Sequence, residues 1–223
     1  PYDVVSNPEF LSEGSAVVDF MKPDRVVLGV SSKRAETVMR EVYAPLKATV
    51  LVTDLKSAEL IKHASNSFLA TKISYINAVS ALCEKVGADV KLVAQGMGLD
   101  RRIGPMFLNA GIGFGGFCFP KDLEAFHWIS KQKGYDFKLL KAVKEINDQQ
   151  LSWVARKIEE KLWNLEGKTV AVLGLAFKPH TDDIRFAPSI EVVSGLKSRG
   201  VKVRAFDPVA AERVNREMLQ LHV

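Results

Sequence analysis

The longest regular pattern in the sequence is a helical periodicity that covers residues 55–86. Apolar side chains recur there at the spacing of one helix face: Leu60, Ile61, Ala64, Phe68, Leu69, Ile73 and Ile76. A helix of this length would run ~45 Å, and an uncapped pattern longer than ~25 residues points to an unusual context. The periodicity therefore predicts one long helix that packs against a partner or spans two domains.

Shorter patterns on both sides of this helix predict strands before it and more helices after it. Three apolar runs read as short strands: 2–5, 25–30 and 49–52. Residues 89–95 predict a short helix ended by Gly96 and Gly98. Residues 120–163 predict two or three helices broken at Gly134.

The last part of the chain alternates strand and helix patterns. Residues 168–176 and 201–206 read as strands, and 188–198 reads as a helix closed by Gly200. A strand, a loop, a helix and a second strand in this order are typical of doubly wound sheets. We therefore expect an α/β domain here, with too few strands for a complete sheet.

Composition and charge exclude several classes of protein. The chain has 47% apolar and 26% charged residues, which are ordinary globular values. Its net charge of +5 favours an anionic ligand only weakly, and no motif indicates nucleic acid. The two cysteines, Cys83 and Cys118, allow neither a disulfide framework nor a paired-cysteine metal site and fit a reducing cytosol. No apolar run approaches the ~20 residues that cross a bilayer, so we expect a cytoplasmic protein without membrane contact.

The segment 109–122, NAGIGFGGFCFPKD, has two competing interpretations. Gly111, Gly113 and Gly116 satisfy the G-x-G-x-x-G pattern of a dinucleotide-binding turn. Such a turn must follow a strand and open directly into a helix, with an acidic residue about 20 positions further on. Residues 107–110 form no strand, so the context favours the second interpretation, a loop that presents a cysteine.

Cys118 stands where a helix is expected to begin. Pro120 suits the first helical position, which makes Phe119 the N-cap. Unpaired N–H groups and the helix dipole would stabilise a thiolate there, and Lys121 and Asp122 fall in the same turn. The glycines would let a ligand approach the backbone, and three phenylalanines could exclude water: Phe114, Phe117 and Phe119. The alternative is a buried, inert cysteine in a tight corner.

Two further groups of polar residues lie upstream. Lys62 and Asn66 are one turn apart on the long helix and could hold an oxyanion and a water, or form an ordinary solvated pair. Glu9 and Glu13 lie in NPEFLSEG, residues 7–14, just after a predicted strand. One of them could act as a base for an attacking water, or the segment could be a capping box at a helix start.

A last polar segment, GLAFKPHTDDIR, follows the strand pattern at 168–176. Lys178 and Arg185 suit anionic phosphates, and arginine can bind them through two hydrogen bonds. The alternative is that Asp182 and Asp183 neutralise these cations internally.

Taken together, four separated motifs resemble those of the nucleotide-sugar dehydrogenases. They are NPEFLSEG, KHASN, RIGPMFLNAGIGFGG running into CFPKD, and GLAFKPHTDDIR running into APS. They occur in the family's order and cover nearly the whole chain. The CFPKD form and the NPEFLSEG wording favour members that act on UDP-glucose over those that act on GDP-mannose.

The resemblance implies a fold and a division into domains. The fold would be a mostly α-helical central dimerisation domain, 6-phosphogluconate-dehydrogenase-like, followed by a partial Rossmann-like α/β domain. Residues 1–53 would be the tail end of the N-terminal α/β domain, 54–165 the central helical and catalytic domain, and 166–223 a partial UDP-binding domain.

The resemblance also implies an activity and its catalytic residues. The C6 alcohol of the sugar would be oxidised to a carboxylate, giving UDP-glucuronate for polysaccharide biosynthesis, with two NAD+ consumed in turn. Cys118 would be the nucleophile that forms a thiohemiacetal and then a thioester. Lys62 would stabilise the oxyanions, Asn66 and Asp122 would position or activate water, and Glu9 would assist hydrolysis. No metal is implied.

Contacts with ligands and with a second subunit follow from the same resemblance. The sugar nucleotide would contact Phe10, Leu11, Glu13, Phe107, Leu108, Asn109, Gly111, Gly115 and Lys178. Arg102 would reach into the substrate site of a partner subunit, and the helix 55–86 would form the core of a homodimer. Glu13, Lys121 and Arg185 match positions that contact NAD.

Two departures from the family pattern limit this comparison. The family's N-terminal domain with its own G-x-G-x-x-G turn is absent, as are the last strands of the UDP-binding domain, so we expect a fragment that alone cannot turn over NAD. Phe117 stands where serine is common, which is expected to narrow the pocket. A non-catalytic dimerisation or nucleotide-binding module, and a hydroxyacid dehydrogenase of similar helical architecture, are the alternatives.

Overall fold

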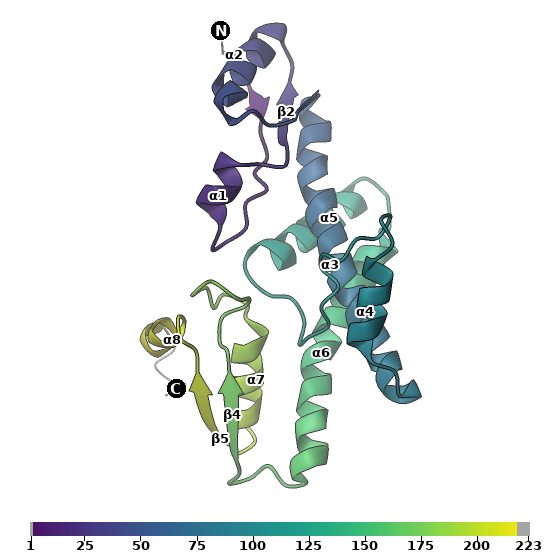
Figure 1. The fold of residues 1–223 in the computed structure, drawn as a ribbon, viewed down its shortest axis with the longest axis vertical. Coiled ribbons are helices and arrows are strands. Elements are labelled where there is room, and N and C mark those ends of the chain that lie inside the picture. Colours follow the sequence, from purple (N-terminus) through teal and green to yellow (C-terminus); the bar gives the residue numbers. More distant parts are fainter. Residues whose placement is uncertain (1, 218–223) are drawn as a thin grey trace. The chain divides into compact units, whose positions relative to one another are not determined.

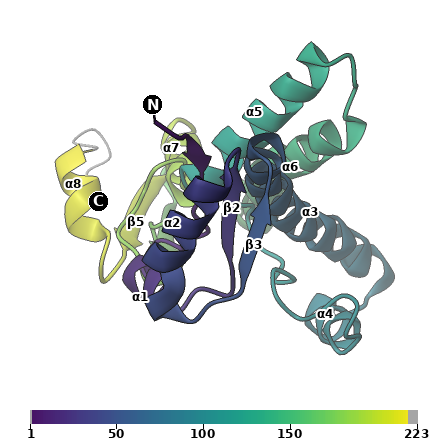
Figure 2. The ribbon, with the colours of Figure 1, turned by 90° about the horizontal axis from the view of Figure 1, so that it is seen from above.

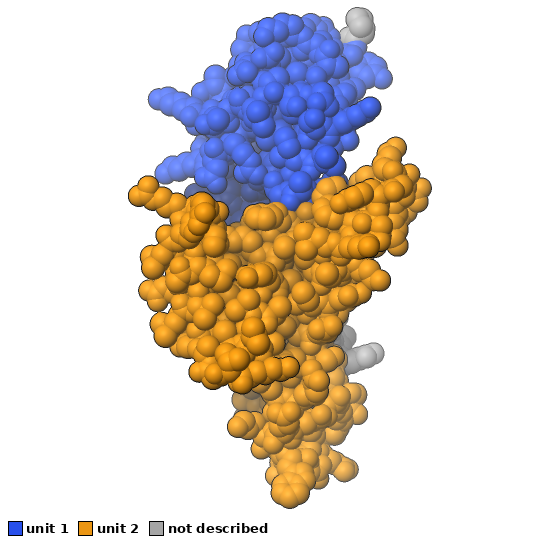
Figure 3. Space-filling view, turned by 90° about the vertical axis from the view of Figure 1, so that its right-hand side faces the viewer, with its two compact units in different colours: residues 1–65 blue, residues 66–223 orange. Residues whose placement is uncertain are grey.

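The computed structural model describes residues 2–217 and divides into two compact units (Figure 3). Unit 1 comprises residues 1–65 and unit 2 residues 66–223. The boundary falls inside the long helix α3 (Leu55–Val86), which contributes to both units (Figure 1).

The predicted helix 55–86 is confirmed with the same bounds. The carboxylate of Asp54 accepts hydrogen bonds from the backbone N–H and the hydroxyl of Ser57, at 3.0 and 2.6 Å. This side chain therefore satisfies one of the free N–H groups of the helix start. The helix ends before Gly87, whose φ of 75° is the left-handed conformation that terminates many helices.

Unit 1 contains a small mixed sheet in the order β1-β2-β3. The strands are β1 (Val5–Ser6), β2 (Val26–Val30) and β3 (Val50–Thr53), with β1 antiparallel and β3 parallel to β2. The central strand is the core of the unit, since Val27 and Leu28 are completely buried. The strands predicted at 25–30 and 49–52 are confirmed within one residue, whereas the strand predicted at 2–5 shares only Val5 with β1.

Two helices of unit 1 are absent from the sequence-based prediction. They are α1 (Ala16–Met21) and α2 (Lys33–Tyr43), which packs against β2 and is followed by the single turn η1 (Ala44–Leu46) (Figure 2). The apolar residues of α2, Ala35, Val38, Met39, Val42 and Tyr43, recur at the spacing of one helix face, so this helix was predictable from periodicity and was missed. Ser32 caps this helix by accepting a hydrogen bond from the N–H of Ala35, at 3.1 Å.

The short helix after α3 is longer than predicted. Helix α4 (Val90–Gly98) begins after its cap Asp89 and runs through both Gly96 and Gly98, so the predicted end at Gly96 is wrong. Gly98 is needed for packing and not for termination. A Cβ atom on it would lie 2.9 Å from Cα of Pro105.

Two long helices complete the helical part of unit 2. They are α5 (Cys118–Gln132) and α6 (Lys138–Leu162), and Gly134, with a φ of 74°, lies between them as predicted. Their shared core is a cluster of buried apolar side chains: Ala70, Phe114, Leu123, Leu140 and Val143. None of the described helices combines the length and the apolar character that a membrane crossing needs.

The end of the chain forms the predicted strand-helix-strand unit. Strands β4 (Thr169–Leu173) and β5 (Lys202–Phe206) are parallel, and α7 (Pro188–Lys197) packs against them (Figure 1). Helix α8 (Ala211–Glu217) follows β5. The prediction of an α/β arrangement here is therefore confirmed.

Asp207, directly after β5, ties two loops of this α/β part together. Its carboxylate accepts hydrogen bonds from the N–H groups of Leu175, Ala176, Val209 and Ala210, at 2.7 to 3.2 Å. Burial raises the pKa of this carboxyl, but the four backbone donors together lower it by more, so that the pKa is about 2 in the folded state. The charged carboxylate therefore stabilises the folded state.

Replacing Asp207 by asparagine is expected to lower the free energy of unfolding by about 2 kcal/mol at neutral pH. Because the folded-state pKa is depressed from 3.8 to about 2, this contribution is complete above 3.8 and is lost as pH falls through 2. Chemical denaturation of both proteins between pH 7 and pH 2 measures the difference. A deficit of the variant that is as large at the lowest pH as at pH 7 would contradict the assignment. Asp182→Asn, which alters an exposed carboxylate in the segment between β4 and α7, is the control.

Candidate active site

Cys118 is the first residue of α5, and its side chain is exposed. Phe117 is therefore the N-cap and Pro120 the third helical residue, so the predicted N-cap at Phe119 is wrong. Proline fits the third position as well as the first, because every N–H of the first turn lacks a partner within the helix. The thiol consequently lies on the helix itself, one turn before Asp122.

Gly115 and Gly116 allow another segment of the same chain, and not a ligand, to approach the glycine loop closely. A Cβ atom on Gly115 would lie 2.0 Å from the carbonyl oxygen of Phe186, and one on Gly116 would lie 2.7 Å from the ring of Phe177. The expected space for a ligand is therefore filled at these two glycines by the segment before α7. At Gly111 the same atom would meet nothing within 4 Å, so this part of the loop is open.

Two asparagines that the sequence analysis does not single out hold the glycine loop in place. Oδ1 of Asn77, on α3, accepts a hydrogen bond from Gly111 N–H at 2.8 Å. Asn147, on α6, accepts from Phe114 N–H at 2.7 Å and donates to Phe114 C=O at 3.1 Å. A polar residue within an apolar helix face, as at Asn77, is the only signal that could have indicated this role.

The structure brings Asn66, Lys121 and Asp122 together. Asn66 Nδ2 donates to one carboxylate oxygen of Asp122 at 2.6 Å, and Lys121 Nζ donates to the other at 2.8 Å. Asp122 is only 3% exposed, whereas the Lys121 side chain is half exposed. A buried carboxylate with an amide and a cation as partners lies one turn after the thiol on α5, an arrangement suited to positioning water.

Within unit 1 the structure brings Glu9 and Lys62 together. Lys62 Nζ donates to the carbonyl oxygen and to Oε1 of Glu9, both at 2.7 Å, and Glu9 Oε2 accepts from Leu11 N–H at 2.7 Å. The ring of Phe10 lies beneath the guanidinium of Arg25, whose Cζ is 3.9 Å from the ring centroid. Segment 9–11 is thus held to α3 through the lysine that precedes Asn66 by one turn.

The loop that contains Phe107 is strained. Phe107 has a φ of 64°, a left-handed conformation that is rare for aromatic residues and is often found in binding sites. Its ring packs at 6.3 Å from that of Phe119. Leu108 is buried and Asn109 is exposed. A ligand here would therefore meet the Asn109 side chain, and Leu108 only through its backbone.

Three further predicted residues have these surroundings. The side chain of Arg102 is 88% exposed and forms an ion pair with Asp100 at 2.6 Å. Glu13 is exposed in unit 1. Lys178 lies with Nζ 5.6 Å from the ring centroid of Phe177.

Lys121 and Arg185 meet at the ring of Phe117. Lys121 Nζ lies 5.6 Å and Arg185 Cζ 5.0 Å from its centroid, and both cationic side chains are about half exposed. Phe117 also lines a pocket of ≈ 780 Å³, together with Lys121, Trp128 and Phe186. Two accessible cations beside one aromatic face fit the phosphates and a ring of a dinucleotide.

Comparison with known proteins gives consistent matches along the chain. Three models of the UDP-glucose/GDP-mannose dehydrogenase family match: the NAD binding domain over residues 1–47, the central domain over 56–149 and the UDP binding domain over 171–222. A UDP-glucose 6-dehydrogenase of Bacillus subtilis (strain 168) is 52% identical over 209 residues, which are 94% of this chain and 45% of that protein. One of Rickettsia bellii is 52% identical, covering 95% of this chain and 50% of that protein.

A solved structure shows the same architecture. The UDP-glucose dehydrogenase of Pyrobaculum islandicum matches with a TM-score of 0.95 and 44% identity, over 98% of this chain and 51% of that one. The chain thus spans about half the length of the relatives that it matches.

Proposed function

Because this chain belongs to the UDP-glucose/GDP-mannose dehydrogenase family, we propose that it carries the thiol-bearing part of an NAD-dependent enzyme that oxidises UDP-glucose to UDP-glucuronate. The observation that carries the proposal is the exposed thiol of Cys118 on the first turn of α5, one turn before the buried Asp122 and its partner Asn66. A nucleophile with a carboxylate and an amide on the next turn is suited to covalent aldehyde chemistry.

Cys118 acts in this proposal as the nucleophile of the second oxidation. When bound, NAD+ accepts one hydride from the sugar carbon C6 in each of two oxidations. The first oxidation leaves an aldehyde, and the Cys118 sulfur adds to its carbon to form a thiohemiacetal. Loss of the second hydride gives a thioester, and attack by water then breaks the C–S bond and frees the thiol. One alcohol, one water and two NAD+ would thus yield one carboxylate, two NADH and three protons.

The proposed catalytic residues have separate roles in this scheme. Lys62 stabilises the oxyanions of the aldehyde adduct and of thioester hydrolysis. Asn66 and Asp122 orient the attacking water, and the buried position of Asp122 fixes its carboxylate. Glu9, which pairs with Lys62 at 2.7 Å, assists the hydrolysis as a base.

Binding residues are proposed on the same basis. Lys121 and Arg185 would hold the anionic part of NAD beside Phe117, with Glu13 as a further contact. Phe10, Leu11, Glu13, Phe107, Leu108, Asn109, Gly111, Gly115 and Lys178 would contact the UDP-sugar. The open backbone at Gly111 supports this assignment, whereas Gly115 is the weakest member of the set, because Phe186 and Pro188 fill the space beside it.

The substrate can be tested in a chimera in which this chain replaces the matching residues of the Bacillus subtilis relative. The chimera is expected to form NADH with UDP-glucose and much more slowly with GDP-mannose or small hydroxyacids. Faster NADH formation with GDP-mannose would favour the alternative family activity. A folded chimera without NADH formation with any nucleotide sugar would favour a non-catalytic module.

A second subunit is proposed to pack against α3. Phe68, Tyr75 and Leu82 are spaced by seven residues and are each more than half exposed, so they form one apolar stripe. A long apolar stripe on the surface of a soluble chain is a common feature of subunit interfaces. We propose that two copies meet along this stripe and that Arg102 contributes to the partner's substrate site.

Replacing Tyr75 by glutamate is expected to turn the dimer into a monomer, because a charge would be buried at the centre of the interface. Sedimentation analysis of the chain measures the change as a shift of the dissociation constant by at least about a hundredfold. Trp128→Glu alters another aromatic residue that is more than half exposed, on α5, and is expected to leave association unchanged. Equal effects of both changes, or a wild-type chain that is monomeric, would contradict the interface.

A further inference from the structure

We propose that Asp183 is a positioning residue that fixes the thiol loop and the Arg185 guanidinium to each other. The thiol loop comprises residues 115–118, and the segment that contacts it comprises residues 177–187, here called the acidic loop. The proposed effect on catalysis depends on the function assigned to Cys118 above, but the mechanical link itself does not.

The two loops are in direct backbone contact. Gly116 N–H donates a hydrogen bond to the carbonyl oxygen of Arg185 at 3.0 Å. Beside this bond, the missing side chains of Gly115 and Gly116 leave room for Phe186 and Phe177. The Arg185 guanidinium faces the ring of Phe117, the N-cap of α5. The position of the helix start that carries Cys118 therefore depends on the conformation of the acidic loop.

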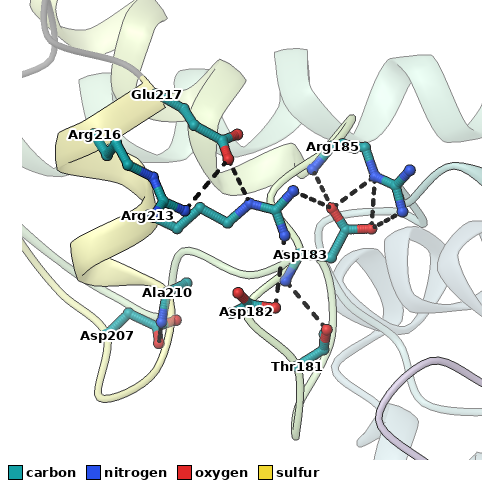
Figure 4. Close-up of polar contacts among 9 residues, drawn as sticks. All are labelled: Thr181, Asp182, Asp183, Arg185, Asp207, Ala210, Arg213, Arg216 and Glu217. Atoms are coloured by element: carbon teal, nitrogen blue, oxygen red, sulfur yellow. Dashed lines mark hydrogen bonds and ion pairs between the residues drawn. The ribbon is translucent and has the colours of Figure 1, made fainter.

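Asp183 is the centre of that loop. Its side chain is fully buried, and its two carboxylate oxygens accept hydrogen bonds from Nε of Arg185 at 2.9 and 3.0 Å and from a terminal nitrogen of Arg185 at 2.7 Å (Figure 4). The carboxylate also accepts from Arg185 N–H at 3.0 Å, and a nitrogen of Arg213 on α8 lies 3.9 Å away.

The backbone of Asp183 is used as well. Its N–H donates to Thr181 Oγ1 at 3.1 Å, and its C=O accepts from Phe177 N–H at 3.0 Å. One residue thus fixes the loop at Phe177, Thr181 and Arg185. Two of these positions, Phe177 and Arg185, are also the ones that contact the thiol loop.

The shape of the acidic loop depends on such bonds, since it holds strained residues on both sides of Asp183. His180 and Phe186 have φ values of 64° and 52°, which are unfavourable for side chains of this size. A buried carboxylate with bidentate arginine geometry is strong enough to hold such a conformation. Neutralising it should release both the Arg185 guanidinium and the Arg185 carbonyl that Gly116 uses.

The test uses the chain itself with Asp183→Asn, which keeps the size of the side chain and removes its charge. Hydrogen exchange of the Gly116 amide is expected to accelerate by at least about tenfold, because its acceptor is no longer held. Alkylation of Cys118 by iodoacetamide, followed by peptide mass spectrometry, is expected to change by at least about threefold. Buried Cys83, 5% exposed, reports global unfolding in the same sample and should keep its rate.

Matched variants make the result decisive. Asp182→Asn alters the neighbouring exposed carboxylate, which contacts Arg213 at 3.6 Å. It should change neither the exchange rate of the Gly116 amide nor the alkylation rate of Cys118. If Asp183→Asn also exposes Cys83, the milder variant Thr181→Val is used instead. It should accelerate hydrogen exchange of the Gly116 amide without exposing Cys83. Unchanged Gly116 exchange and Cys118 alkylation in a folded Asp183 or Thr181 variant would overturn the proposal. Because neither reading requires turnover, an inactive chimera would count against the function and leave the link between the loops standing.

Discussion

Replacing Cys118 by alanine is expected to abolish formation of UDP-glucuronate by the chimera. Without the thiol no thiohemiacetal or thioester can form, so the second oxidation and the hydrolysis lose their covalent intermediates. The loss of kcat should be at least about a thousandfold, the range found when a catalytic nucleophile is removed. The binding of UDP-glucose should change little, because the sulfur contributes to the reaction and not to recognition of the nucleotide.

The other cysteine of the chain is the matched control. Cys83 is 5% exposed on α3, so Cys83→Ala tests the loss of a thiol outside the proposed site. It should lower stability slightly and leave kcat unchanged. A Cys118→Ala chimera that keeps more than about a tenth of the wild-type kcat would remove the covalent mechanism from consideration.

Replacing Gly115 by alanine is expected to have the largest effect on stability. The new Cβ atom would lie 2.0 Å from the carbonyl oxygen of Phe186 and 2.8 Å from Cδ of Pro188, and both atoms belong to stiff parts of the chain. The thiol loop and the acidic loop would have to separate, which breaks the hydrogen bond between Gly116 and Arg185. We expect the free energy of unfolding to fall by about 3 kcal/mol or more.

A second glycine of the same loop gives the comparison. A Cβ atom on Gly111 meets nothing within 4 Å, so Gly111→Ala should change the free energy of unfolding by less than about 0.5 kcal/mol. Denaturant unfolding of both variants measures the difference. Equal stability of the two would show that the contact between the loops is not tight, and it would also weaken the role proposed for Asp183.

The features that the sequence predicts well are those determined by neighbours along the chain. The helix 55–86 follows from its periodicity, and Asp54 and Gly87 mark its ends through local hydrogen bonds and backbone conformation. The parallel β4 and β5 with their helix are predictable for the same reason. Helix α1 is not, because its six residues are too few to show a helical period and none of them is buried, whereas α2 carries a clear helical periodicity that the sequence analysis overlooked.

The start of α5 shows how local rules become ambiguous. Proline favours the first helical position but is compatible with the whole first turn, so Pro120 alone cannot decide between Cys118 and Pro120 as the first residue. Contacts outside the helix decide it, since Gly116 is bound to Arg185 far along the chain. The sequence shows that position 116 is a glycine, but it does not show that the carbonyl group of Arg185 lies against it.

Contacts between residues far apart in the sequence could not be predicted from local patterns either. Asn66 and Asp122 are 56 residues apart, and Lys62 and Glu9 are 53 apart, so no spacing rule links them. The resemblance to a family nominates these residues, and the structure shows that each pair is in contact. The sequence indicates Asp183 only as an internal counter-charge for the nearby cations. Its link to the thiol loop, and the contacts of Asn77 and Asn147 with Gly111 and Phe114, depend on which backbone groups the fold places beside these side chains.

The most direct test of the account is the ratio of NADH formed to UDP-glucuronate formed when the chimera consumes UDP-glucose. Two hydrides must leave the sugar carbon before the thioester can be hydrolysed, so the account predicts two NADH for each UDP-glucuronate and no free aldehyde. The ratio is measured by the absorbance of NADH and by chromatography of the nucleotide sugars. One NADH for each aldehyde released, or no NADH from a folded chimera that binds UDP-glucose, would contradict the account.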